Sequence, residues 1–135
     1  MSMRNVIPYV SNNEFDCLIV QKVVTNAFPD ATFLCIQRGQ GALQWLTSLP
    51  KTDLPLFLVV DYFLPDLDAK QLATQIREVP EFEGLPLILL GEWPVPDSDF
   101  NLDALGPVVY LKKSIDLELF QTDLERAMLE FWQRA

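Results

Sequence analysis

Short apolar runs alternate with longer segments of helical periodicity along the chain. The apolar runs have the length of strands and cover residues 6–10, 31–37, 54–60, 85–90 and 107–111. Two of them, LPLFLVV and LPLILL, are apolar at nearly every position, which is typical of strands buried on both faces of a parallel sheet. Apolar side chains recur every three or four residues in the segments between them, which predicts helices. These helices cover residues 14–27, 40–49, 69–77, a short stretch at 97–105, and the chain from 116 onward.

Five strands that alternate with five helices define the fold class. Parallel strands in one sheet are joined by right-handed crossovers, so the helices cover both faces of the sheet. The sequence therefore predicts a single doubly wound α/β domain over residues 1–135, with a five-stranded parallel sheet. In such sheets the functional groups lie at the carboxyl ends of the strands.

Composition excludes several classes of function. The 135 residues carry 10 Lys and Arg against 19 Asp and Glu, a formal net charge of −9, so binding to nucleic acid is not expected. The chain has no His, which excludes Ser-His or Cys-His nucleophile pairs and phosphohistidine chemistry within it. No apolar stretch approaches the roughly 20 residues that span a bilayer. Because no signal peptide is recognisable either, we expect a cytoplasmic protein that does not bind membranes.

The two cysteines, Cys17 and Cys35, lie within apolar stretches, and no CxxC motif occurs. We expect two buried thiols in a reducing compartment.

An aspartate follows the most apolar predicted strand. Asp61 comes directly after LPLFLVV, at the rim of an apolar wall where a carboxylate requires a cation or hydrogen bonds. Lys113, after the last predicted strand, is the expected partner. The two residues form either an ion pair that braces the sheet or a reactive carboxylate beside a lysine that holds an anion. Their place at the strand ends favours the second interpretation.

Two segments resemble response-regulator receiver domains. LVVDYFLPDLD is similar to their phosphoacceptor strand and loop, and VVYLKKSID is similar to their last strand with its lysine. The spacings from Asp61 to Gly91 and from Gly91 to Lys113 also match. The ending LERAMLEFWQRA resembles stand-alone receivers of the cyanobacterial phytochrome-partner type. The resemblance implies a flavodoxin-like topology, with strand order 2-1-3-4-5, in a bacterial two-component phosphorelay.

The resemblance also implies roles for single residues. Asp61 would accept a phosphoryl group from a histidine kinase, and Lys113 would bind the phosphoryl oxygens. The backbone carbonyl of Phe63 would be a Mg²⁺ ligand, and Tyr110 would be the aromatic switch residue.

The chain departs from the receiver pattern at two parts of the switch. The acidic pair of the family falls on Ser11 and Asn12, so the metal site would consist of Asp61, Asn12 and the Phe63 carbonyl, with one carboxylate. Mg²⁺ prefers carboxylate and phosphate oxygens, so we expect Mg²⁺ to bind weakly or not at all. The switch hydroxyl of the family falls on Gly91, which has no side chain.

Other acidic residues near the predicted strand ends have simpler interpretations. Glu14 and Asp16 would complement the dipole of the first helix. Asp66 and Asp68 would cap the helix after Asp61 or face solvent. Glu92 is the best candidate for a substitute metal ligand.

The leading interpretation is a receiver-like signalling module, not an enzyme, that acts by protein–protein interaction with impaired or absent Mg²⁺-dependent phosphorylation. The alternative is a functional phosphoacceptor in which a histidine kinase phosphorylates Asp61 and Asn12 or Glu92 holds the metal. A remote alternative is an aspartate-nucleophile phosphohydrolase. That class requires a second acid two residues after the nucleophile, where this chain has Phe63.

The expected partner is a histidine kinase or another signalling protein. Its docking face would consist of the fourth helix, fifth strand and fifth helix, which could also form a homodimer. Trp93 and Trp132 would border this face as a patch if both are exposed. Alternatively, Phe131 packs into the core and Trp132 covers its edge.

Overall fold

Five parallel strands form one sheet in the order β2-β1-β3-β4-β5. The computed structural model describes residues 2–92 and 102–133. The strands are β1 (Val6–Val10), β2 (Thr32–Ile36), β3 (Leu58–Asp61), β4 (Leu87–Gly91) and β5 (Val108–Lys112). The predicted strand order and the doubly wound topology are confirmed.

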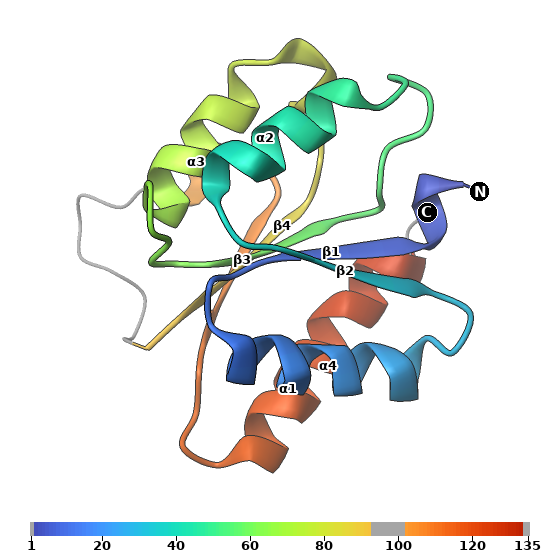
Figure 1. The fold of residues 1–135 in the computed structure, drawn as a ribbon, viewed down its shortest axis with the longest axis vertical. Coiled ribbons are helices and arrows are strands. Elements are labelled where there is room, and N and C mark those ends of the chain that lie inside the picture. Colours follow the sequence, from blue (N-terminus) through green and yellow to red (C-terminus); the bar gives the residue numbers. More distant parts are fainter. Residues whose placement is uncertain (1, 93–101, 134–135) are drawn as a thin grey trace.

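Helices cover both faces of the sheet (Figure 1). α1 (Glu14–Ala27) and α4 (Leu117–Gln133) lie on one face, and α2 (Gly39–Ser48) and α3 (Ala69–Arg77) lie on the other. None of the helices within residues 2–92 and 102–133 has the length and apolar character that a membrane crossing requires.

The prediction of five helices is wrong, because the described part of the chain has four α-helices. Of the helix expected over 97–105, residues 97–101 lie outside the described residues, and the remainder is a short 3-10 turn, Leu102–Leu105. The turn ends at Gly106, which has a positive φ of 75° that a glycine adopts without strain. Pro107 follows and also disfavours a helix.

Side chains alternate between the two faces of the sheet and build one core on each. Ile7 and Tyr9 of β1 and Val59 of β3 pack with α1 and α4, whereas Val10 and Val60 pack with α2 and α3. Asp61, two residues after Val59, therefore projects toward the face that Tyr9 occupies.

Short polar side chains fix the helix N-termini. The Asn13 side chain accepts a hydrogen bond from the Asp16 amide at the start of α1. Asp68 forms a capping box with Gln71 at the start of α3, as predicted for a cap of the helix after Asp61.

Asp66 caps a different helix from the one expected. Its two carboxylate oxygens accept hydrogen bonds from the Gly39 and Gln40 amides, each at 2.9 Å. These amides begin α2, whose own N-cap residue, Arg38, makes no capping hydrogen bond with its side chain. Asp66 thus ties the loop after β3 to the start of α2.

The expectation of two buried thiols is wrong. Cys17 of α1 and Cys35 of β2 form a disulfide, with Cα atoms 6.6 Å apart, and both residues are half-buried. The crossover from β1 lays α1 beside β2, so two positions that are distant in sequence meet. A sequence pattern without CxxC does not reveal this contact.

The C-terminal aromatic pair packs against the core. Phe131 is buried, and the ring of Trp132 lies 4.7 Å from that of Phe28, centroid to centroid. This is the second of the two arrangements expected for the pair. Trp93 lies outside the described residues.

Candidate functional site

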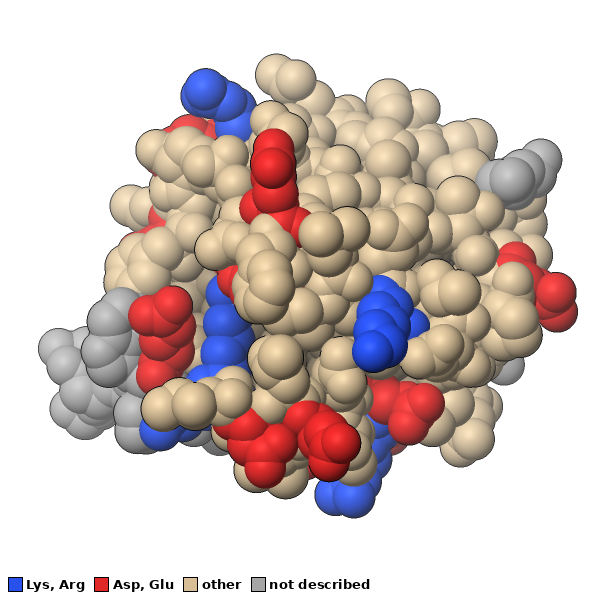
Figure 2. Space-filling view, turned by 60° about the horizontal axis from the view of Figure 1, so that its bottom comes forward, with Lys and Arg blue, Asp and Glu red and all other residues tan. Residues whose placement is uncertain are grey.

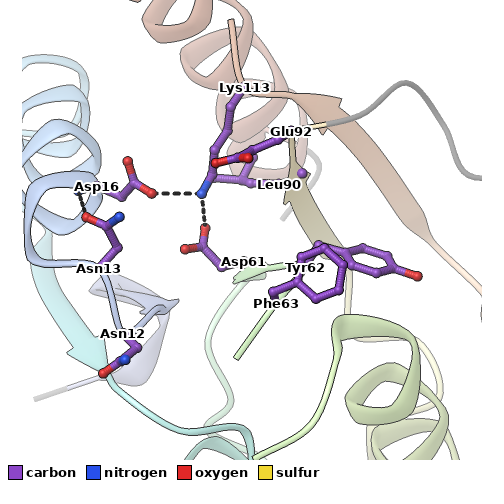
Figure 3. A pocket seen from close by; sticks show the side chains of 10 residues that line it. Asn12, Asn13, Asp16, Asp61, Tyr62, Phe63, Leu90, Glu92 and Lys113 are labelled. Carbon is purple, nitrogen blue, oxygen red and sulfur yellow. Dashed lines mark hydrogen bonds and ion pairs between the residues drawn. The ribbon is translucent and has the colours of Figure 1, made fainter. Parts of the chain in front are cut away.

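A pocket of about 330 Å³ opens at the carboxyl ends of the strands (Figure 3). It brings together most of the site residues predicted from sequence. Its lining consists of Asn12, Asn13, Asp16, Asp61, Tyr62, Phe63, Leu90, Gly91, Glu92 and Lys113.

Asp61, at the end of β3, is buried and held by three donors. The Ser11 hydroxyl donates to Oδ2 at 2.6 Å, and the Tyr9 hydroxyl donates to Oδ1. The Lys113 ammonium lies 3.1 Å from Oδ1. We call Asp61 and these three donors the Asp61 cage. Both oxygens of the carboxylate are therefore already engaged.

Burial sets the protonation behaviour of the Asp61 cage. Burial raises the pKa of the Asp61 carboxyl above its usual value, although Lys113, Ser11 and Tyr9 oppose the shift by stabilising the ionised form. Burial also raises the pKa of the Tyr9 phenol far above its usual value, and the charge of Asp61 and the hydrogen bond to it add to the effect. Tyr9 therefore remains a hydrogen-bond donor at neutral pH.

Lys113 bridges two carboxylates. Its ammonium lies 2.8 Å from Asp16 Oδ2 in addition to its contact with Asp61 (Figure 3). Burial would lower the pKa of Lys113, but the charge of Asp61 and the hydrogen bond and charge of Asp16 raise it above its usual value. Lys113 is therefore charged, and its ammonium is already paired with the carboxylates of Asp16 and Asp61.

Two residues of the site, Tyr9 and Asp16, were not recognised from the sequence. Tyr9 lies two positions before Ser11, so the side chains of both residues face Asp61, and this alternation was a signal for Tyr9. Asp16 was interpreted as a charge that complements the helix dipole. It lies in the first turn of α1, which begins shortly after β1 ends, and its side chain reaches Lys113. Glu14 is exposed.

The two residues at the positions of the family's acidic pair lie in different surroundings. Ser11 is buried within the Asp61 cage, whereas Asn12 is exposed and its side chain points away from Asp61 (Figure 3). Phe63 lies in the pocket wall and forms an isolated bridge with Asp68. Among the residues that the structure describes, no three acidic or cysteine side chains are grouped as a metal ion would require.

Gly91 and Tyr110, the two predicted switch positions, are in contact. A β carbon on Gly91 would lie 2.8 Å from Tyr110 Cζ and would collide with the Tyr110 hydroxyl. The ring of Tyr110 therefore occupies the space that a side chain at position 91 would fill. It also meets the Tyr62 ring edge-on, with centroids 6.3 Å apart. Tyr110 is thus turned inward, over the end of β4.

One curated protein is similar in sequence to nearly the whole chain. No protein-family model matches the chain. The response regulator Rcp1 of Synechocystis sp. is 24% identical over 131 residues, which cover 94% of this chain and 88% of that protein.

Solved structures match nearly the whole chain. The phosphorylated cyanobacterial phytochrome response regulator RcpA has a TM-score of 0.79 and 21% identity, over 95% of this chain and 93% of that one. The Mn²⁺-bound form of Rcp1 has a TM-score of 0.77 and 22% identity, over 94% and 93%. The receiver domain of a sensor histidine kinase from Pseudomonas aeruginosa, with a coordinated magnesium ion, has a TM-score of 0.74 and 17% identity, over 95% and 97%.

The fold is that of response-regulator receiver domains, and the resemblance seen in the sequence is confirmed. The proteins it resembles include Rcp1 and RcpA, in keeping with the likeness of its C-terminal segment to the phytochrome-partner type.

Proposed function

We propose that this protein is a cytoplasmic receiver module of two-component signalling that works by binding other proteins, without Mg²⁺-dependent phosphorylation of Asp61 and without enzymatic activity of its own. The observation that carries the proposal is the Asp61 cage. Each oxygen of the carboxylate accepts a hydrogen bond from a hydroxyl, and one of them also faces an ammonium.

A caged carboxylate is a poor phosphoacceptor for two reasons. The attacking oxygen must be released from a donor, and a hydrogen bond to a charged group contributes about 1.5–3 kcal/mol. Phosphoryl transfer in this fold also needs a divalent ion to neutralise the developing charge. The residues at the expected metal positions do not fit such an ion, because Ser11 is committed to Asp61 and Asn12 points away from it.

Phosphorylation with a small-molecule donor tests the proposal. With phosphoramidate and millimolar Mg²⁺, we expect intact-mass analysis to show no phosphorylated wild-type protein. The variant that restores the acidic pair and removes two of the three donors, Ser11→Asp/Asn12→Asp/Tyr9→Phe, should gain modification, and adding Asp61→Asn to it should remove that gain. Stoichiometric modification of the wild type that disappears in Asp61→Asn would show that the proposal is wrong.

A functional phosphoacceptor is the second candidate, and one observation favours it. Asp16 and Glu92 line the same pocket as Asp61, so the pocket contains three carboxylates against one lysine. Titration of the wild type, Asp16→Asn and Glu92→Gln with Mg²⁺ separates the candidates. Millimolar affinity that either substitution weakens would favour the phosphoacceptor, whereas no saturable binding would favour the interaction module.

Exposed apolar side chains support an interaction role. One groove of about 850 Å³ is lined by Phe15 of α1, by Ile115 just before α4, and by Leu117 and Leu119 at the start of α4. Ile115 is fully exposed, which is unusual for a residue of its size. Figure 2 shows the face that holds α1 and the start of α4, where both acidic and basic side chains lie among uncharged ones.

We expect the partner on this groove to be a helix with apolar side chains flanked by basic ones. Three carboxylates and two lysines line the groove, namely Asp16, Glu92, Asp123, Lys112 and Lys113, and the chain as a whole carries −9. A cationic amphipathic peptide should therefore shift NMR signals of the groove, and its acidic counterpart should not. Ile115→Ser/Leu119→Ser should abolish the shifts, and Phe63→Ser, at an exposed residue that does not line the groove, should leave them. Equal binding of both peptides would contradict this assignment.

The expected partner remains a histidine kinase or another signalling protein. The homodimer expected through the predicted fourth helix, the fifth strand and the predicted fifth helix remains a prediction. Of the two tryptophans expected to border that face, Trp93 lies outside the described residues and Trp132 packs on Phe28.

A further inference from the structure

The disulfide between Cys17 and Cys35 is open to solvent. It joins α1 to β2 across 18 residues of sequence. Both cysteines are half-buried, and with Leu18 and Gln37 they line a surface groove of about 310 Å³. A thiolate must reach a sulfur atom to open a disulfide, and exposed disulfides are the more readily exchanged ones. The groove provides that access.

Both ends of the disulfide adjoin the Asp61 cage. In α1, Cys17 follows Asp16, whose carboxylate binds the lysine of the cage at 2.8 Å. In β2, Cys35 Sγ lies 3.8 Å from the carbonyl oxygen of Ser11, whose hydroxyl holds Asp61. The disulfide therefore ties together the two segments that position the donors of the cage.

Reduction changes the hydrogen bonding at Ser11 as well as the covalent link. A sulfur atom in a disulfide carries no hydrogen, whereas the thiol of a reduced Cys35 can donate to the Ser11 carbonyl at the observed distance. The two redox states consequently differ in a contact to the residue whose side chain holds Asp61.

We propose that Cys17 and Cys35 form a reversible thiol–disulfide site, reduced by dithiols, that regulates the Asp61 cage. One thiolate of the dithiol attacks a sulfur atom, the S–S bond breaks, and the released sulfur takes up a proton. The second thiol of the reductant then attacks the reductant's own sulfur in the mixed disulfide, and the remaining cysteine leaves as a thiol. The cysteine pair gains two electrons and two protons, and the reductant leaves as its own disulfide. Disulfides in reducing compartments are usually transient and redox-sensing, which fits a cytoplasmic protein.

Thiol labelling of the purified protein tests whether the site is reversible. After treatment with oxidised glutathione, intact-mass analysis with a maleimide should detect no labelled thiol, and after reduced dithiothreitol it should detect both. Closure and opening should repeat over several cycles. Two thiols that label after oxidation would overturn the proposal, and so would a disulfide that resists the reductant in the folded protein.

Hydrogen exchange tests whether the site regulates the cage. Backbone amides of residues 11–17 should exchange about tenfold faster in the reduced protein, because allosteric couplings typically change an equilibrium by that order. Amides of α3 should be unchanged. The variant Cys17→Ser/Cys35→Ser should resemble the reduced protein and ignore the reductant. Equal exchange in both states, or an equal change in α3, would overturn the proposal.

The proposal rests on the proposed function only in taking the caged aspartate as the unphosphorylated state. Phosphorylation of the oxidised wild type by phosphoramidate would contradict the proposed function and leave the labelling and exchange results standing. Absence of an exchange difference would contradict the redox site and leave the proposed function standing.

Discussion

Position 91 shows how one missing side chain changes the site. In the receiver pattern a hydroxyl residue stands there, but Gly91 carries no side chain, and the Tyr110 ring fills the space instead. The inward position of Tyr110 consequently depends on close approach to a glycine, and no phosphoryl group is needed to produce it.

The substitution Gly91→Ala should therefore destabilise the protein. The new β carbon would overlap the Tyr110 hydroxyl, and overpacking of a well-packed region costs about 1–3 kcal/mol. Urea denaturation would measure the loss. Gly84→Ala is the matched control, because a β carbon there meets nothing within 4 Å. Adding Tyr110→Ala to Gly91→Ala should abolish the overlap, so an unchanged loss from Gly91→Ala in that background would contradict this explanation.

At the residue scale, the sequence predicted the charged residues that end apolar strands, but it did not predict the side chains that contact them. Asp61 and Lys113 were recognisable because a charge at the end of an apolar strand needs a partner. Tyr9 and Asp16 were missed because a tyrosine in a strand and an acid in a first helical turn both have ordinary structural explanations. Only the three-dimensional position of α1 shows that Asp16 reaches Lys113.

The start of α2 illustrates a helix that depends on a side chain from another element. Its N-cap residue makes no capping hydrogen bond with its side chain, and Asp66 supplies the acceptors instead. Slight burial raises the pKa of Asp66, but the amides of Gln40 and Gly39 outweigh this effect and lower the pKa below its usual value.

The substitution Asp66→Ala should cost about 1 kcal/mol at pH 7, as the loss of a helix cap does. A carboxylate with a lowered folded-state pKa contributes stability above its usual pKa of about 4, and this contribution disappears as the pH falls through the lowered value. The difference between wild type and variant in urea unfolding should therefore shrink as the pH falls below about 4. A difference that is constant from pH 7 to pH 3 would contradict the capping role.

Arg77 stabilises the connection between β4 and β5. At the end of α3, its guanidinium donates to the backbone carbonyls of Leu105, Phe82 and Pro107. It thereby fixes the described 3-10 turn and the start of β5 to α3.

We expect Arg77→Lys to lower the free energy of unfolding by about 2 kcal/mol. A lysine carries the charge but cannot reach three acceptors with a planar group, and each hydrogen bond to a charged group contributes about 1.5–3 kcal/mol. Chemical denaturation of the variant measures this, with Arg126→Lys on the exposed face of α4 as the control. Equal stability of the two variants would exclude a structural role for the guanidinium.

At the element scale, hydrophobic patterns predicted the strands and the four α-helices that the structure describes, with ends that differ by a few residues. Periodicity failed for residues 102–105, the described part of the helix expected there, where Gly106 and Pro107 terminate a short 3-10 turn. The disulfide was missed because pairing between α1 and β2 depends on the crossover and on no local motif.

The charge of the whole molecule affects its stability. A net charge of −9 on 135 residues causes self-repulsion that salt screens. Raising NaCl from about 0.02 to 0.3 M should increase the melting temperature by about 2–4 °C. At equal ionic strength, MgCl₂ should add no more than NaCl, because a ligand stabilises only the state that binds it. A distinctly larger effect of MgCl₂ would indicate a specific magnesium site.

All three tyrosines of the chain gather at one end of the sheet. Tyr9 donates to Asp61, Tyr62 lines the pocket, and Tyr110 lies over Gly91. Tyrosine signals that are resolved from those of the three tryptophans, such as vibrational bands of the phenol ring, are consequently local reporters, since no tyrosine elsewhere contributes to them. They can follow events at this end of the molecule, whichever ion, partner or reductant brings them about.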